Sequence, residues 1–83
     1  MPGSKPRLLL LSRPDCHLCE EFRDDLLARF GTAVDLDEAC VDDRPEWRER
    51  YGRDIPVLLT AAGAELCRHR LDRDALEHHL GAQ

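Results

Sequence analysis

Two cysteines separated by two residues, in the segment Cys16-His17-Leu18-Cys19, are the side chains of this sequence best suited to chemistry. At the start of a helix, this spacing brings two Cβ atoms to within disulfide range, about 3.8 Å. The free N–H groups and the positive dipole end found there lower a thiol pKa and favour the nucleophilic thiolate. The motif therefore predicts a dithiol–disulfide site, with Cys16 as the nucleophile and Cys19 as the better protected, resolving thiol.

The cysteines allow two other interpretations. Structural zinc needs four ligands, and a second pair with suitable spacing is missing, because Cys40, Cys67 and the four histidines are scattered. We therefore expect no metal at this site. The two motif cysteines could also be ordinary helix residues, whereas Cys40, placed beyond the second strand, and Cys67, in the last, are predicted to be buried structural thiols.

Further residues are expected to assist the dithiol. Arg13 precedes it by three positions and is predicted to stabilise the thiolate, as His17 does when it is protonated. The Ile55-Pro56 pair opens a predicted strand, where a residue without an N–H is tolerated. A cis bond there would expose the Ile55 backbone for pairing with an extended substrate, and a trans proline that merely begins a strand is the alternative.

Composition limits the classes of function. The 83 residues fit one domain, and a formal net charge of −5 argues against a nucleic-acid partner. The longest apolar run, Leu8 to Leu11, is too short for a membrane span or a secretory leader. We therefore expect a cytoplasmic protein with no membrane or nucleic-acid partner, and a monomer.

The elements that must position the motif follow from apolar periodicity. Residues 1–6 are predicted to form a disordered tail and residues 7–83 one domain. Arg7 to Ser12 reads as a strand buried on both faces. The helix that follows should end at Gly31 and turn one side of its surface to the core. The residues predicted on that side are Leu18, Phe22, Leu26, Leu27 and Phe30.

The remaining chain alternates strands and helices. A second strand is predicted over residues 33–37, a short helix over Pro45 to Tyr51, and a hairpin of strands over residues 55–60 and 65–68. Either Asp43 or Arg44 is expected to cap the short helix, and Asp72 to cap a last helix that runs through Leu80. The order β-α-β-α-β-β-α requires a parallel pair and an antiparallel hairpin. The fold class is therefore α/β, a four-stranded mixed sheet with three helices.

These segments resemble the glutaredoxin branch of the thioredoxin-like superfamily, over Arg7 to Leu80. The resemblance is carried by residues 8–19, LLLLSRPDCHLC, by residues 51–57, YGRDIPV, and by the element order. The chain resembles in particular the short bacterial glutaredoxin-like proteins that carry C-H-L-C or C-P-L-C. The resemblance implies that Cys16 is the nucleophilic and Cys19 the resolving cysteine, that the bond before Pro56 is cis, and that Arg13 lies near the thiolate and glutathione.

The sequence also departs from that family. His17-Leu18 stands where dithiol glutaredoxins have Pro-Tyr, and Ile55 where they often have Val. Their glutathione-binding Gly-Gly has no clear match, and Asp72 is the candidate for the acidic residue that follows it. The expected substrates are disulfide-containing proteins or glutathione mixed disulfides, with no bound cofactor and with glutathione as a candidate co-substrate.

The function predicted from the whole sequence is that of a small glutaredoxin-like thiol–disulfide oxidoreductase. The alternatives are a thioredoxin-fold adaptor that binds a partner protein without redox turnover, and a carrier of a metal or iron–sulfur group.

Overall fold

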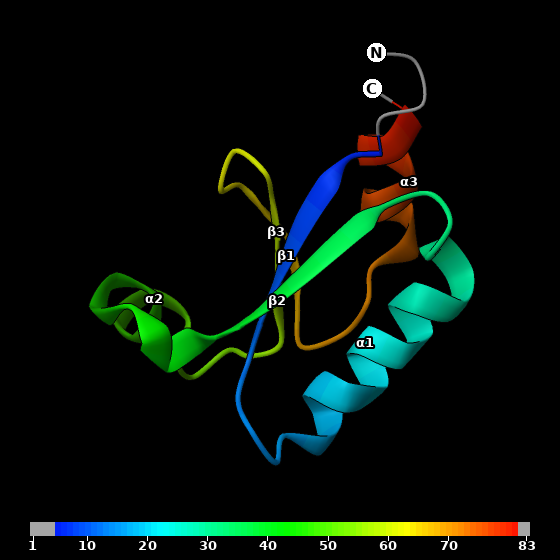
Figure 1. Ribbon diagram of the computed structural model, residues 1–83. Coiled ribbons are helices and arrows are strands. Elements are labelled where there is room, and N and C mark those ends of the chain that lie inside the picture. The colour runs from blue at the N-terminus through cyan, green and yellow to red at the C-terminus, as the bar shows by residue number, and fades with distance from the viewer. Residues whose placement is uncertain (1–4, 82–83) are drawn as a thin grey trace.

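The computed structural model describes residues 5–81, so residues 1–4 of the predicted tail lie outside the described residues. Figure 1 shows the elements in order: β1 (Arg7–Ser12), α1 (His17–Phe30), β2 (Asp35–Cys40), the 3₁₀ turn η1 (Val41–Asp43), α2 (Pro45–Tyr51), β3 (Val57–Thr60), β4 (Glu65–Arg68) and α3 (Arg73–Gly81). Apart from η1, this is the predicted order. No helix within residues 5–81 is long and apolar enough to cross a membrane.

The four strands form one mixed sheet in the order β2-β1-β3-β4. β1 pairs with β2 in parallel, and the β1–β3 and β3–β4 pairs are antiparallel. The predicted α/β fold class is thus confirmed. The register places Ser12 beside Cys40, so β1 and β2 end at the same edge of the sheet. The loop that carries the cysteines starts from this edge.

Both faces of the sheet are covered, as the unbroken leucine run of β1 predicts. Leu8 and Leu10 pack with Phe22 and Leu26 of α1 on one face. Leu11 packs on the other face in a cluster with Tyr51 of α2. In Figure 1, α1 and α3 accordingly lie on one side of the sheet and α2 on the other. A strand that contributes to two cores cannot alternate apolar with polar residues.

Two strand boundaries differ from the prediction. The second strand runs over Asp35–Cys40 rather than 33–37, because it follows β1 residue by residue from Arg7 to Ser12. The third strand begins at Val57 rather than at residue 55, after Pro56, which has no N–H to donate to a ladder. The first shift comes from pairing with β1, which local propensity does not encode, and the second from the proline itself.

The orientation of α1 also differs. Leu18 is 59% exposed and Leu27 is 45% exposed, so the prediction that both face the core is wrong. The buried residues are Cys19, Phe22 and Leu26, which follow the i, i+3, i+7 spacing of a helix face. The helix is rotated so that Cys19, and not Leu18, points at the sheet.

The helix ends agree with the expected capping chemistry. Arg44 is the N-cap of α2, with Pro45 at the first helical position, so the second of the two proposed caps is the correct one. The Asp72 carboxylate accepts a hydrogen bond from the N–H of Ala75 at 3.0 Å and caps α3 as predicted.

Candidate functional site

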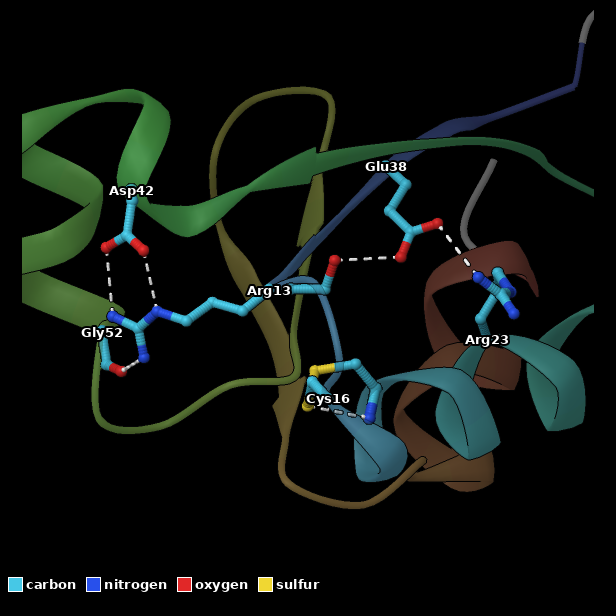
Figure 2. The surroundings of a disulfide bond; sticks show 8 residues. Arg13, Cys16, Arg23, Glu38, Asp42 and Gly52 are labelled. Atoms are coloured by element: carbon cyan, nitrogen blue, oxygen red, sulfur yellow. Dashed lines mark hydrogen bonds and ion pairs between the residues drawn. A yellow bond between two sulfur atoms is a disulfide. The ribbon is translucent and has the colours of Figure 1, made fainter.

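Cys16 and Cys19 form a disulfide at the N-terminus of α1, with their Cα atoms 5.2 Å apart. Cys16 is the N-cap residue, and its Sγ accepts a hydrogen bond from the N–H of Cys19 at 3.2 Å (Figure 2). That N–H is one of the donors that a helix leaves unpaired in its first turn. The same donor is in place to stabilise negative charge on the Cys16 sulfur after reduction.

The two sulfurs differ in access. Cys16 is half-buried in the loop, whereas Cys19 is 1% exposed and belongs to the buried face of α1. An incoming disulfide can therefore reach Cys16 and not Cys19. This difference in exposure matches the assignment of an attacking and a resolving thiol made from the sequence.

The segment before β3 approaches the same edge of the sheet. Leu11 lies opposite Val57 in the antiparallel β1–β3 pair, so Pro56 sits beside the end of β1, from which the Cys16 loop starts. The Ile55–Pro56 bond is cis, as the resemblance implies. Pro56 is buried and its carbonyl accepts the N–H of His69 at 2.8 Å, while Ile55 is half-buried. The structure thus brings the predicted residues Ile55 and Pro56 to the dithiol end of the sheet.

The Arg13 side chain, which the sequence predicts to stabilise the thiolate, binds a carboxylate and a backbone carbonyl. Its Nε and Nη2 donate to the two carboxylate oxygens of Asp42 at 2.9 and 3.1 Å. Its Nη1 donates to the carbonyl of Gly52 at 2.7 Å. Figure 2 shows the side chain directed toward these partners and away from the disulfide. Sequence reasoning missed Asp42 and Gly52 because they are 29 and 39 residues away along the chain.

The other two predicted site residues are His17 and Asp72. The His17 side chain is 83% exposed and pairs with Glu21 of the next turn of α1, with 3.5 Å between Nε2 and Oε1. Asp72 lines a hollow of about 590 Å³ beside β4 and α3. Arg68, Arg70 and Arg73 line the same hollow. Cys19 lines a different hollow, which Asp72 does not line.

A polar cluster lies beside Cys19, and the sequence analysis does not predict it. A hollow of about 330 Å³ is lined by Cys19 together with Ser12, Arg23 and Glu38. The buried Ser12 hydroxyl donates to Glu38 at 2.9 Å, and Arg23 of α1 pairs with the same carboxylate at 3.6 Å (Figure 2). The parallel register of β1 and β2 could have revealed this cluster had the bounds of the second strand been known.

The remaining cysteines have different surroundings. Cys67 is 8% exposed, as predicted, and burial raises the pKa of its thiol. Cys40 is the last residue of β2 rather than lying beyond it, and it is half-buried, so its predicted burial is wrong. Within residues 5–81, no group of three or more His, Cys, Asp or Glu side chains is arranged to hold a metal ion.

The fold and the disulfide together define a thioredoxin-fold protein with a dithiol motif at the start of its first helix. Residues 7–81 match the model of the glutaredoxin-like domain family (DUF836), and the chain belongs to that family. No curated protein matches the chain significantly.

Solved structures agree with this assignment. The solution NMR structure of protein Ne2328 from Nitrosomonas europaea is 27% identical, with a TM-score of 0.82 and 92% of each chain covered. The X-ray structure of protein XcR50 from X. campestris is 30% identical, with a TM-score of 0.66, and the match covers 92% of this chain and 97% of that one. Similarity over almost the whole length of both proteins shows that this chain shares their complete fold.

Proposed function

We propose that this protein is a thiol–disulfide oxidoreductase that reduces disulfides through Cys16 and Cys19. The observation that carries the proposal is the unequal environment of the two bonded sulfurs. Cys16 is reachable and hydrogen-bonded to a helix N–H, whereas Cys19 is buried at 1% exposure. A purely structural disulfide gains nothing from such an arrangement. A dithiol catalyst, by contrast, needs one accessible sulfur that attacks the substrate and one protected sulfur that resolves the mixed disulfide.

The reaction has two exchange steps. The Cys16 thiolate attacks one sulfur of the substrate disulfide, which forms a mixed disulfide and releases the other substrate sulfur as a thiolate that takes up a proton. The Cys19 thiol then loses its proton and attacks the Cys16 sulfur. This step forms the Cys16–Cys19 disulfide and releases the second substrate thiolate, so two electrons pass from the dithiol to the substrate.

An external thiol must return those two electrons before the next cycle. We propose glutathione as this co-substrate and the reducing cytoplasm as the setting, where such thiols are abundant. The proposed substrates are disulfide-containing proteins and glutathione mixed disulfides, handled by a monomer. Membership of the glutaredoxin-like family supports the thiol chemistry.

A redox titration in glutathione buffers tests the proposal. Alkylation followed by intact-mass measurement counts free thiols, with Cys16→Ser and Cys19→Ser as test variants and Cys40→Ser as the matched control. We expect a reversible two-electron couple at roughly −180 to −270 mV that both test variants lose and the control keeps. A lasting glutathione adduct on the Cys19→Ser protein would support glutathione as the co-substrate.

The absence of any couple in the unaltered protein would overturn the proposal, as would a couple that survives in Cys16→Ser. In the first case the adaptor interpretation of the fold would take its place.

A further inference from the structure

The Arg13 side chain connects three segments that are distant in the sequence. Its own position follows the last residue of β1, Asp42 lies in η1 after β2, and Gly52 ends α2. All three donor nitrogens of the guanidinium are used, two on the carboxylate and one on the carbonyl. Gly52 is followed by the short loop that leads to Ile55 and Pro56.

The geometry of this junction makes it stronger than an ordinary surface ion pair. Two parallel N–H···O bonds to one carboxylate are the fork arrangement that arginine, and not lysine, can form. The hydrogen bonds from Arg13 hold the pKa of Asp42 below its ordinary value, and Arg48 adds to the effect at 3.6 Å. A methyl group at Gly52 would lie 3.2 Å from Nη2 of Arg13, so the guanidinium is packed closely against this backbone.

The loop on the far side of the junction is itself hydrogen-bonded. The N–H of Gly52 donates to the carbonyl of Arg48 at 3.0 Å, and the N–H of Asp54 donates to that of Tyr51 at 2.8 Å. Residues 52–54 therefore form a compact turn, and a fixed Gly52 carbonyl fixes the start of the segment that ends at Pro56.

We infer that Arg13 is a positioning residue that clasps the Cys16 loop to the Gly52–Pro56 loop. The inference rests on the proposed function, because it names the residue that sets the spacing between the Cys16 loop and the Gly52–Pro56 loop, where a substrate disulfide would bind. Arg13 does not act as a charge on the thiolate, because Asp42 and Gly52 hold its guanidinium. The Cys16 sulfur instead accepts a hydrogen bond from the N–H of Cys19.

Two substitutions separate clasping from charge stabilisation. Arg13→Lys keeps the positive charge and loses the fork, whereas Asp42→Asn weakens the fork and leaves the arginine charge free to turn toward the sulfur. The matched controls are Arg7→Lys and Asp37→Asn, which alter an exposed ion pair of 3.3 Å at the opposite end of β1 and β2.

We expect both test variants to behave alike. Their kcat/KM for the reduction of insulin disulfides should fall roughly tenfold or more, mainly through KM, because small misplacements of a binding loop are costly. The midpoint pH for alkylation of Cys16 by iodoacetamide should not move. The controls should match the unaltered protein in both measurements.

Amide hydrogen exchange provides a measurement that does not depend on turnover. We expect the amides of Gly52 and Asp54 to exchange faster in both test variants and at unchanged rates in the controls. If the unaltered protein reduces no disulfide, the proposed function fails while this measurement still decides whether the clasp exists.

The opposite pattern would overturn the inference. If Arg13 acts by charge, Arg13→Lys would keep normal kinetics and exchange, and Asp42→Asn would move the alkylation midpoint to lower pH. Unchanged exchange at Gly52 and Asp54 in both test variants would also refute the clasp.

Discussion

Three leucines of α1 provide a sharp test of how the helix that carries the dithiol is seated. Leu26 is 0% exposed, Leu27 is 45% exposed and Leu18 is 59% exposed. Apolar periodicity predicts all three on the core face, whereas the structure leaves only Leu26 there. Replacement of each by alanine removes the same three carbon atoms, so the costs differ only through the surroundings.

The expected magnitudes follow from burial. At about 0.8 kcal/mol for each buried carbon, Leu26→Ala loses about 2.4 kcal/mol in transfer free energy. The cavity left in the core brings the cost to about 2–5 kcal/mol. Leu27→Ala and Leu18→Ala should cost about 1 kcal/mol or less, because much of each side chain already contacts water and no closed cavity forms.

Urea unfolding followed by circular dichroism measures the difference, with the disulfide intact in every variant so that the unfolded chains are equally cross-linked. A gap of about 2 kcal/mol between Leu26→Ala and Leu27→Ala corresponds to about 8–16 °C in Tm for a domain of this size. Equal losses at the two positions would mean that Leu27 is buried as deeply as Leu26, and the orientation of α1 given by the structure would be wrong.

Three further results are expected. The Arg68 guanidinium holds the pKa of Glu65 below its ordinary value of 4.5, so the stability from this pair is complete above pH 4.5 and is lost as the pH falls through the lowered pKa. In Glu65→Gln, the urea midpoint of unfolding should therefore fall less steeply with decreasing pH, and an unaltered pH dependence would contradict this. In the native protein Cys67 should react with iodoacetamide much more slowly than Cys40, and the two should become equal in urea; equal native rates would show that Cys67 is not buried. Asp72→Ala should lower the free energy of unfolding by about 0.5–2 kcal/mol, measured by urea unfolding, and no loss would show that the cap contributes nothing.

The site combines local and long-range features that respond differently to such changes. The disulfide and its helix N–H donor lie within four consecutive residues, so they depend on α1 alone. The approach of Pro56 depends on the β1–β3 register, and the Arg13 clasp on η1 and α2 as well. Substitutions in α2 or η1 are therefore expected to change substrate binding more than the reactivity of the Cys16 thiol.

Features that arise between near neighbours in the chain could be predicted from the amino-acid sequence. Helix geometry alone brings Cys16 and Cys19 to within bonding distance, and the cap of α3 by Asp72 follows from side-chain chemistry over three residues. The unbroken run of leucines in β1 predicted a strand that is buried on both faces, and the two core clusters confirm it. The element order then left a mixed four-stranded sheet as the arrangement that buries every apolar face.

Features that depend on partners far away in the chain could not be predicted in this way, because they are set by how the elements pack. Pairing with β1 moved the second strand to Asp35–Cys40, and packing against the sheet left Leu18 and Leu27 exposed to water. Arg13 could be recognised in the sequence as a cation close to the dithiol, yet its partners are set by where the chain returns 29 and 39 residues later. A guanidinium binds whichever oxygens the fold brings to it, and near the Cys16 loop the fold brings Asp42 and Gly52.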